Sequence, residues 1–213
     1  MRLLPLVFLA ALMAGCSSVY YNTMEKIGIP KRQILVDRVE AARGAQQAAK
    51  QQFASALEQF LAVTKVPPSE LKNTYERLND ELKRSEARAK EVRDRVTSID
   101  SVAQALFKEW NDELTQFSNQ GLRSQSERQL DATKRRYAEL MRVMNTAAER
   151  MEPVLVTFRD HVLFLKHNLN AQAIAALGNT TKDLQADIGR LIAEMEKSIK
   201  EADEFISSMQ AVK

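Results

Sequence analysis

Cys16 is the one cysteine in this sequence and the residue best suited to covalent chemistry. It follows the small residues Ala14 and Gly15. A thiol can act as a nucleophile, bind a metal, form a disulfide or accept an acyl group. No disulfide can form within the chain, because it has no second cysteine. Small neighbours leave the thiol and the peptide bond before it accessible, so the pattern favours covalent modification of Cys16.

The segment before Cys16 has the pattern of a signal peptide. Arg2 is followed by an apolar run from Leu3 to Met13 that only Pro5 interrupts. This run of about eleven residues is too short for a transmembrane helix, which needs about 20. We therefore predict that residues 1–15 are a signal peptide that is removed, and that the chain is exported.

The sequence Leu12-Met13-Ala14-Gly15-Cys16 resembles the lipobox of bacterial lipoproteins. Met13 differs from the pattern, which usually has Leu at this place. The resemblance implies cleavage between Gly15 and Cys16, followed by attachment of fatty acyl groups such as palmitate to Cys16. Each buried CH₂ contributes about 0.8 kcal/mol, so several acyl chains would hold the protein at a membrane. An ordinary signal peptide with a coincidental cysteine is the alternative.

The residues after the cysteine bear on the compartment. Ser17 and Ser18 stand where an Asp would imply retention in the inner membrane. By analogy with the sorting rule for such lipoproteins, they imply an outer-membrane anchor with the body facing the periplasm. Inner-membrane retention is the less favoured alternative.

Other chemistry has little support in the sequence. His161 and His167 are six residues apart, about 120° from a common helix face, and lack the i, i+4 spacing of a metal pair. The chain has no GxxxxGK[ST] phosphate loop and no nucleophile elbow. We expect no metal, no cofactor and no enzymatic activity. A hydrolase with an unrecognised site is a weak alternative.

The composition predicts a mostly helical protein. With 6 Gly and 5 Pro in 213 residues, the chain has few turn formers, whereas residues that favour helices are abundant. Breaks at Pro67-Pro68, Asn119-Gln120-Gly121 and Gly178-Asn179 predict helices over 31–65, 69–119, 124–177 and 180–211. Ser124 with Glu127, and Thr180 with Asp183, have the spacing of capping boxes at the last two starts. We predict a lipidated linker over 16–30 and one helical coiled-coil domain over 31–213.

Each predicted helix carries an apolar seam in steps of four and three residues, the pattern of a coiled coil. Pro153 coincides with an extra step of four in the third helix, which predicts a kink or local unwinding there. The seams also include Gln46, Ser85 and Ser198. In the second helix the seam is Leu71, Tyr75, Leu78, Leu82, Ser85, Ala89, Val92, Val96, Ile99, Ala103, Leu106, Trp110, Glu113 and Phe117.

Short connections make consecutive helices antiparallel, so the fold class is all-α, an elongated antiparallel four-helix coiled-coil bundle. The two middle helices are the longest. They should project as a hairpin over about 103–146, roughly 25–30 Å beyond the outer helices, with Gly121 at the tip. The tip should point the same way as the chain termini.

The projecting hairpin is the candidate contact surface. The net charge is only +3, and most charges are expected to form solvated pairs between helices. The interleaved Glu127, Asp131 and Glu139, and the export signal, argue against a nucleic-acid partner. The residues singled out are the apolar Phe107, Trp110, Leu114 and Phe117 and the basic Arg123, Arg128, Lys134, Arg135, Arg136 and Arg142.

Two functions follow from these patterns. The first is a non-enzymatic envelope scaffold, anchored to the membrane through Cys16, that binds an unidentified envelope protein through the hairpin. The second is a binding module for anionic lipid head groups or cell-wall polymer that uses the basic side of the hairpin. Salt should weaken the second kind of contact but not the first. The sequence leaves the oligomeric state open.

A longer resemblance points the same way. It rests on Val19-Tyr20-Tyr21-Asn22, on Gly28 through Val39, and on the segments at Gln52-Phe53 and Ala56 through Phe60. These residues resemble the bacterial lipoprotein family called domain of unknown function 2959. The resemblance covers nearly the whole mature chain and implies an envelope lipoprotein with a helical body. It implies no activity and adds no site residue.

Overall fold

The computed structural model describes residue 21, residues 23–24, 28–63, 67–168 and 171–211. Within these residues the chain forms four long helices: α2 (Lys31–Ala62), α3 (Leu71–Glu113), α4 (Gln120–His167) and α5 (Ala171–Gln210). Short 3₁₀ turns at Pro68–Glu70 and Leu114–Gln116 flank α3. The expected all-α bundle is confirmed.

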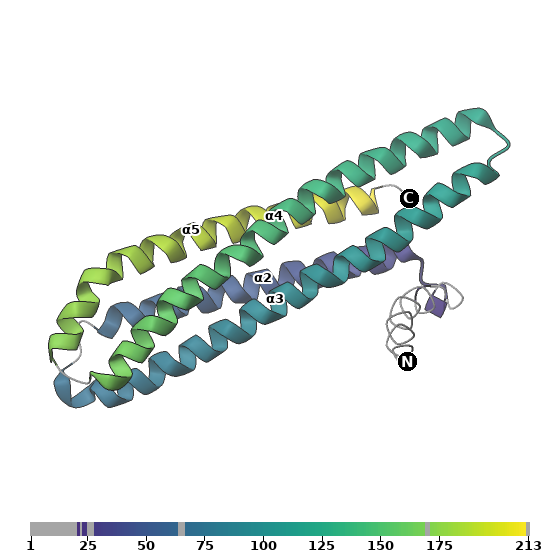
Figure 1. Cartoon of the computed structure of the whole chain (residues 1–213). Coiled ribbons are helices and arrows are strands. Elements are labelled where there is room, and N and C mark those ends of the chain that lie inside the picture. Colours follow the sequence, from purple (N-terminus) through teal and green to yellow (C-terminus); the bar gives the residue numbers. More distant parts are fainter. Residues whose placement is uncertain (1–20, 22, 25–27, 64–66, 169–170, 212–213) are drawn as a thin grey trace, which may run out of the picture.

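Each helix packs against two others: α2 against α3 and α5, and α4 against α3 and α5. The hairpin of α3 and α4 extends beyond the start of α2 and the end of α5 (Figure 1). Ion pairs join neighbouring helices at Arg43–Asp203 and Arg159–Glu86, with N–O distances of 2.5 and 2.6 Å. These pairs confirm the expected charge pairing between helices, and because they are solvated each contributes well under about 1 kcal/mol.

The seams form the core. All eight seam positions of α5 from Leu184 to Met209, and the nine of α2 from Leu35 to Val63, are buried. Phe60 of α2 meets Phe158 of α4 edge to face, with ring centroids 6.1 Å apart. The heptad pattern therefore identified the packed face of each helix, except at the end of the second seam, where Glu113 and Phe117 are exposed.

α2 begins at Lys31 and the break at Pro67-Pro68 lies between α2 and α3, both as predicted, but the last break differs from the expected one. α4 ends at His167, and α5 runs through Gly178 and Thr180, where the sequence predicted a turn and a capping box. A lone Gly inside a helix costs only about 1 kcal/mol, which packing easily outweighs. At the true end, the side chain of Asn168 donates to the Phe164 carbonyl oxygen at 3.0 Å. The fourth helix is therefore longer than predicted.

The start of α4 also differs from the predicted one, since the helix begins at Gln120 and not at residue 124. The Asn119 side chain caps the helix by accepting from the Leu122 N–H at 3.1 Å, and the Ser124–Glu127 pair lies inside the helix. α3 ends at Glu113, six residues earlier than predicted. Pro153 lies within α4, which continues through it without the predicted unwinding. A proline removes one backbone N–H, and the buried residues on either side hold the helix together.

The hairpin projects beyond the start of α2 about as expected. Gln52 of α2 donates to the Glu81 carboxylate of α3, so the start of α2, 21 residues earlier in an antiparallel pair, lies level with about residue 102 of α3. From there the Lys31 side chain reaches along α3, with its Nζ 3.2 Å from the Glu109 Oε1. Arg32 bonds to the Met209 carbonyl oxygen, so the end of α5 lies beside the start of α2.

Three fully buried polar residues, Gln46, Ser85 and Ser198, interrupt the apolar seams. Ser85 satisfies its hydroxyl by donating to the Glu81 carbonyl oxygen at 2.8 Å. In the described part of the chain, neither amide atom of Gln46 and no atom of the Ser198 side chain has a hydrogen-bond partner. An unpartnered buried polar group costs about 1–3 kcal/mol, so this layer weakens the bundle.

We expect Gln46→Met to raise the free energy of unfolding by about 1 kcal/mol, because it removes the unpartnered amide while keeping the side-chain volume. Urea denaturation followed by circular dichroism measures the change. Gln51→Met, at an exposed position of the same helix, is the control and should leave the midpoint unchanged. A lower midpoint for Gln46→Met would show that the amide is satisfied in the folded protein.

Candidate contact surface on the helical hairpin

The hairpin of α3 and α4 is closed by a tightly built tip. The 3₁₀ turn Leu114–Gln116 carries the chain out of α3, and Phe117 has extended backbone angles of φ −71° and ψ 120°. Asn119 then caps α4. A Cβ on Gly121 would lie 3.2 Å from the Asn119 Oδ1, so a small residue suits this position. These features fix the tip as a short, ordered turn.

Aromatic side chains join the two helices below the tip. Phe107 and Tyr137 pack edge to face, with centroids 5.3 Å apart, and Tyr137 donates to the Asp100 Oδ1 at 2.7 Å. Burial, followed by this hydrogen bond, raises the pKa of Tyr137 above its ordinary value. The Trp110 Nε1 donates to the Ser126 Oγ at 2.8 Å. These contacts bind the two helices to each other.

Two of the apolar residues expected on the contact surface are therefore inside the hairpin. Phe107 and Leu114 are buried, and Trp110 is half-buried against the core. Phe117 is exposed, at 37%, and Leu122 is exposed at 54%. The sequence analysis missed Leu122, because its seam pattern starts only at Leu130. We call Phe117 and Leu122 the tip pair.

The six basic residues fall into two groups. Arg123 pairs with Glu127 at 3.5 Å and Arg142 with Glu139 at 2.5 Å, each within one turn of α4. In the part of the chain that the structure describes, the other four have no ion-pair partner, and we call them the free cations. They are Arg128, Lys134, Arg135 and Arg136.

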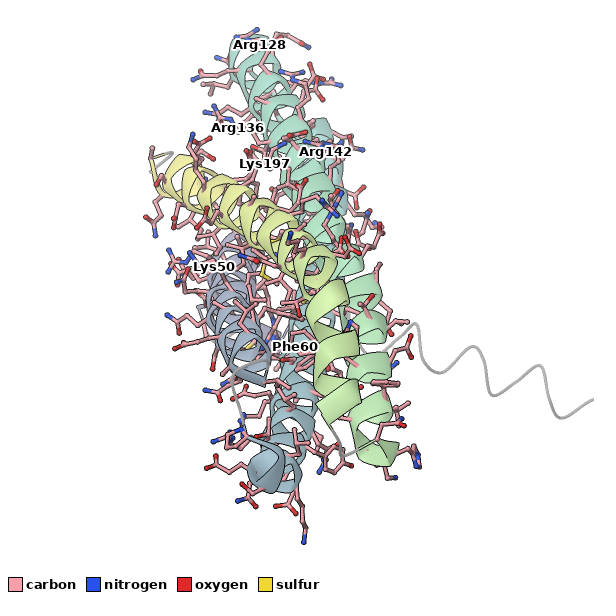
Figure 2. The ribbon with its side chains drawn as sticks, turned by 90° about the vertical axis from the view of Figure 1, so that its left-hand side faces the viewer. Lys50, Phe60, Arg128, Arg136, Arg142 and Lys197 are labelled. Carbon is pink, nitrogen blue, oxygen red and sulfur yellow. The ribbon has the colours of Figure 1, made fainter. Side chains whose placement is uncertain are left out.

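Arg128 lies near the end of the hairpin, and Arg136 and Arg142 follow further along α4 (Figure 2). Arg128 and Arg135 are seven residues apart and thus share one face of the helix. Lys134 borders an open depression of about 530 Å³ beside Phe107 and Tyr137. The hairpin therefore presents unneutralised positive charge along α4 and an exposed apolar pair at its tip.

The two histidines lie far from the tip. His161 packs against Phe60 with ring centroids 5.1 Å apart, and burial lowers its pKa below the ordinary value, opposed by nearby Asp160. His167 is exposed in the last turn of α4. Among the described residues, no group of three His, Cys, Asp or Glu side chains lies close enough to hold a metal ion. Cys16 lies outside the described residues.

Tyr21 is a contact that the sequence analysis did not anticipate. Its side chain is buried, at 5% exposure, and its hydroxyl is hydrogen-bonded to the Ser101 Oγ of α3 at 2.5 Å. Met24 also packs against the core, and Gly28 takes a positive φ of 87° before α2 begins. The predicted linker is thus attached to α3 through Tyr21, at Ser101.

Within the described residues, no helix has the length and hydropathy to cross a membrane. The exposed residues Val156, Leu163 and Phe164 form a second apolar area on α4, near the opposite end of the bundle.

We expect Phe107→Ala to loosen the hairpin locally, because it removes a buried ring whose loss costs about 3 kcal/mol. Hydrogen exchange should accelerate between residues 103 and 137 while the seams further along the bundle stay protected. The emission of Trp110, the one tryptophan, should shift to longer wavelength. Lys108→Ala, at the adjacent exposed position, is the control. Unchanged exchange in Phe107→Ala would contradict the observed packing.

Comparison with known proteins gives a family and no close relative of known role. No curated protein and no solved structure matches the chain. One family model, described as protein of unknown function (DUF2959), matches residues 20–209. The match begins one residue before Tyr21 and ends at Met209, so it includes the Tyr21 contact and all four helices. The chain therefore belongs to the DUF2959 family.

Proposed function

We propose that the protein is a non-enzymatic cell-envelope lipoprotein, a helical scaffold or partner-binding rod anchored to a membrane through acylated Cys16. The observation that carries the proposal is the lipobox-type sequence ending at Cys16, five residues before Tyr21, the first described residue, which packs on the body. Cleavage before Cys16 would leave almost no free chain between the lipid and the bundle. Ser17 and Ser18 favour the outer membrane, with the body in the periplasm.

The build of the body supports a mechanical rather than a chemical role. Its seams are filled by close-packed side chains, and the half-buried histidine, His161, packs against Phe60. The depressions on its surface are open to solvent, and charged side chains line most of the one beside Lys31, Glu109 and Asp112. Long packed helices give a rigid rod that can hold a contact surface at a fixed place.

A second function is favoured by the free cations. They have no acidic partner among the described residues, so they are available to lipid phosphates or to an acidic cell-wall polymer. A protein partner would instead engage the exposed Phe117. Leu114→Asp does not test such a contact, because Leu114 is buried and its replacement would damage the hairpin itself.

We expect the natural chain to incorporate radiolabelled palmitate and to be recovered with the outer membrane, and Cys16→Ala to lose both the label and the membrane recovery. Without the thiol there is no acceptor for the acyl group. Ser18→Ala, two residues away, should keep both and is the control. An unlabelled natural chain recovered as soluble protein would contradict the anchor.

A further inference from the structure

We infer that the tip pair contacts the head groups of the same membrane that holds Cys16, and that the opposite end of the bundle points away from it. This inference rests on the lipid anchor proposed above. It follows from where Tyr21 is attached, from how far the chain before Tyr21 can reach, and from the chemistry of the tip.

The first step is the attachment of Tyr21. Its buried ring and the hydrogen bond to Ser101 hold the chain against α3. The distance between Cys16 and the body is therefore limited from Ser101 and not from the end of the bundle. Only the residues before Tyr21 determine how far the membrane can be.

The second step is the length of this tether. Cys16 and Tyr21 are five residues apart, which span at most about 18 Å when fully extended. Along α3, Leu71 lies thirty residues from Ser101, about 45 Å. In the other direction, Gln116 lies about 24 Å from Ser101.

These lengths exclude one orientation. An upright bundle with Leu71 toward the membrane would drive that end more than about 20 Å into the bilayer, since the tether spans at most about 18 Å of the 45 Å. The exposed Glu70 and Lys72 near that end forbid such burial, because charged side chains are costly in hydrocarbon. With the hairpin toward the membrane, the shortfall is only about 6 Å, the depth of the head groups.

The third step is the chemistry of the tip. It favours contact between the tip and the membrane over an arrangement in which the bundle lies flat on the membrane. Phe117 and Leu122 are exposed at the membrane-proximal end, and the free cation Arg128 lies less than two helical turns beyond Leu122 on α4. Apolar side chains beside basic ones match the boundary between acyl chains and anionic head groups. Burying the tip pair and neutralising the free cations both favour the orientation in which the hairpin points toward the membrane.

The test uses the acylated full chain in vesicles that contain phosphatidylglycerol and a lipid with a nitroxide head group. Acylated Cys16 offers no free thiol, so a cysteine introduced by Ser118→Cys or by Ser69→Cys can carry a fluorescent label at one place. Both serines are exposed, one at the tip and one beside the start of α3. We expect several-fold stronger quenching at position 118 than at position 69.

Two further variants test the steps separately. Tyr21→Ala should release the tether and lower the quenching at position 118 toward that at position 69, while flotation with the vesicles is unchanged. Phe117→Ser combined with Leu122→Ser should also lower the quenching at position 118. Raising the salt concentration should lower it further if the free cations contribute.

The outcomes are distinguishable. A chain that does not float with the vesicles overturns the lipid anchor itself. A chain that floats but shows equal or stronger quenching at position 69 overturns the inferred orientation and leaves the anchor standing. Unchanged quenching at position 118 in Tyr21→Ala would show that the Tyr21 attachment does not set the orientation.

Discussion

A single helix of about 40 residues gains little stability in water from its own hydrogen bonds, so each long helix of this protein depends on covering its apolar seam with its neighbours. α2 to α5 do this in a closed ring in which every helix packs on two others. Ion pairs such as Arg43–Asp203 lie at the solvated edges of this ring and follow from the packing. The position of every exposed group, including the hairpin tip, depends on the register that the seams impose.

The seams end before the hairpin does, and apolar side chains at the tip are therefore exposed. The end of the hairpin extends beyond the start of α2 and the end of α5 (Figure 1), and there the Trp110–Ser126 hydrogen bond and the buried Leu114 join α3 and α4. Two helices cannot bury every apolar residue at their end, and Phe117 and Leu122 stay exposed. Tyr21 is attached to Ser101 on the same part of the molecule. The fold therefore relates the tip to the segment that would carry the proposed anchor.

The seams and the four-helix bundle could be predicted from the sequence, because apolar residues in steps of four and three over about ten turns are typical of packed helices. The family was predicted from a resemblance of the residues between Val19 and Phe60. The break at Asn168 could not, since a lone Gly178 looks like a stop and packing in the bundle overrides its small cost. The residue that caps the start of α4 was equally ambiguous in the sequence, because Asn119 and Ser124 are both common at helix starts. In the folded hairpin Asn119 is the cap, since its side chain accepts from the Leu122 N–H.

The candidate surface was predicted in part. The basic residues were found, but which of them stay unpaired depends on neighbours such as Glu127 and Glu139 within the same turns. Phe107 and Leu114 were expected outside and lie inside, because a seam shows which face packs but not how far two helices alone can cover it. Tyr21 was read as part of a linker, since a contact across eighty residues leaves no periodic signal.

The attachment of Tyr21 to α3 is the claim on which the placement of the whole molecule rests. It is tested most directly by replacing Tyr21 with the photoreactive p-azidophenylalanine, which keeps the aromatic ring, in the full chain and mapping the crosslinks by mass spectrometry. The account predicts crosslinks to α3 around Ser101 and none to the part of α3 near Leu71. Absence of crosslinks around Ser101, with helicity unchanged, would contradict it.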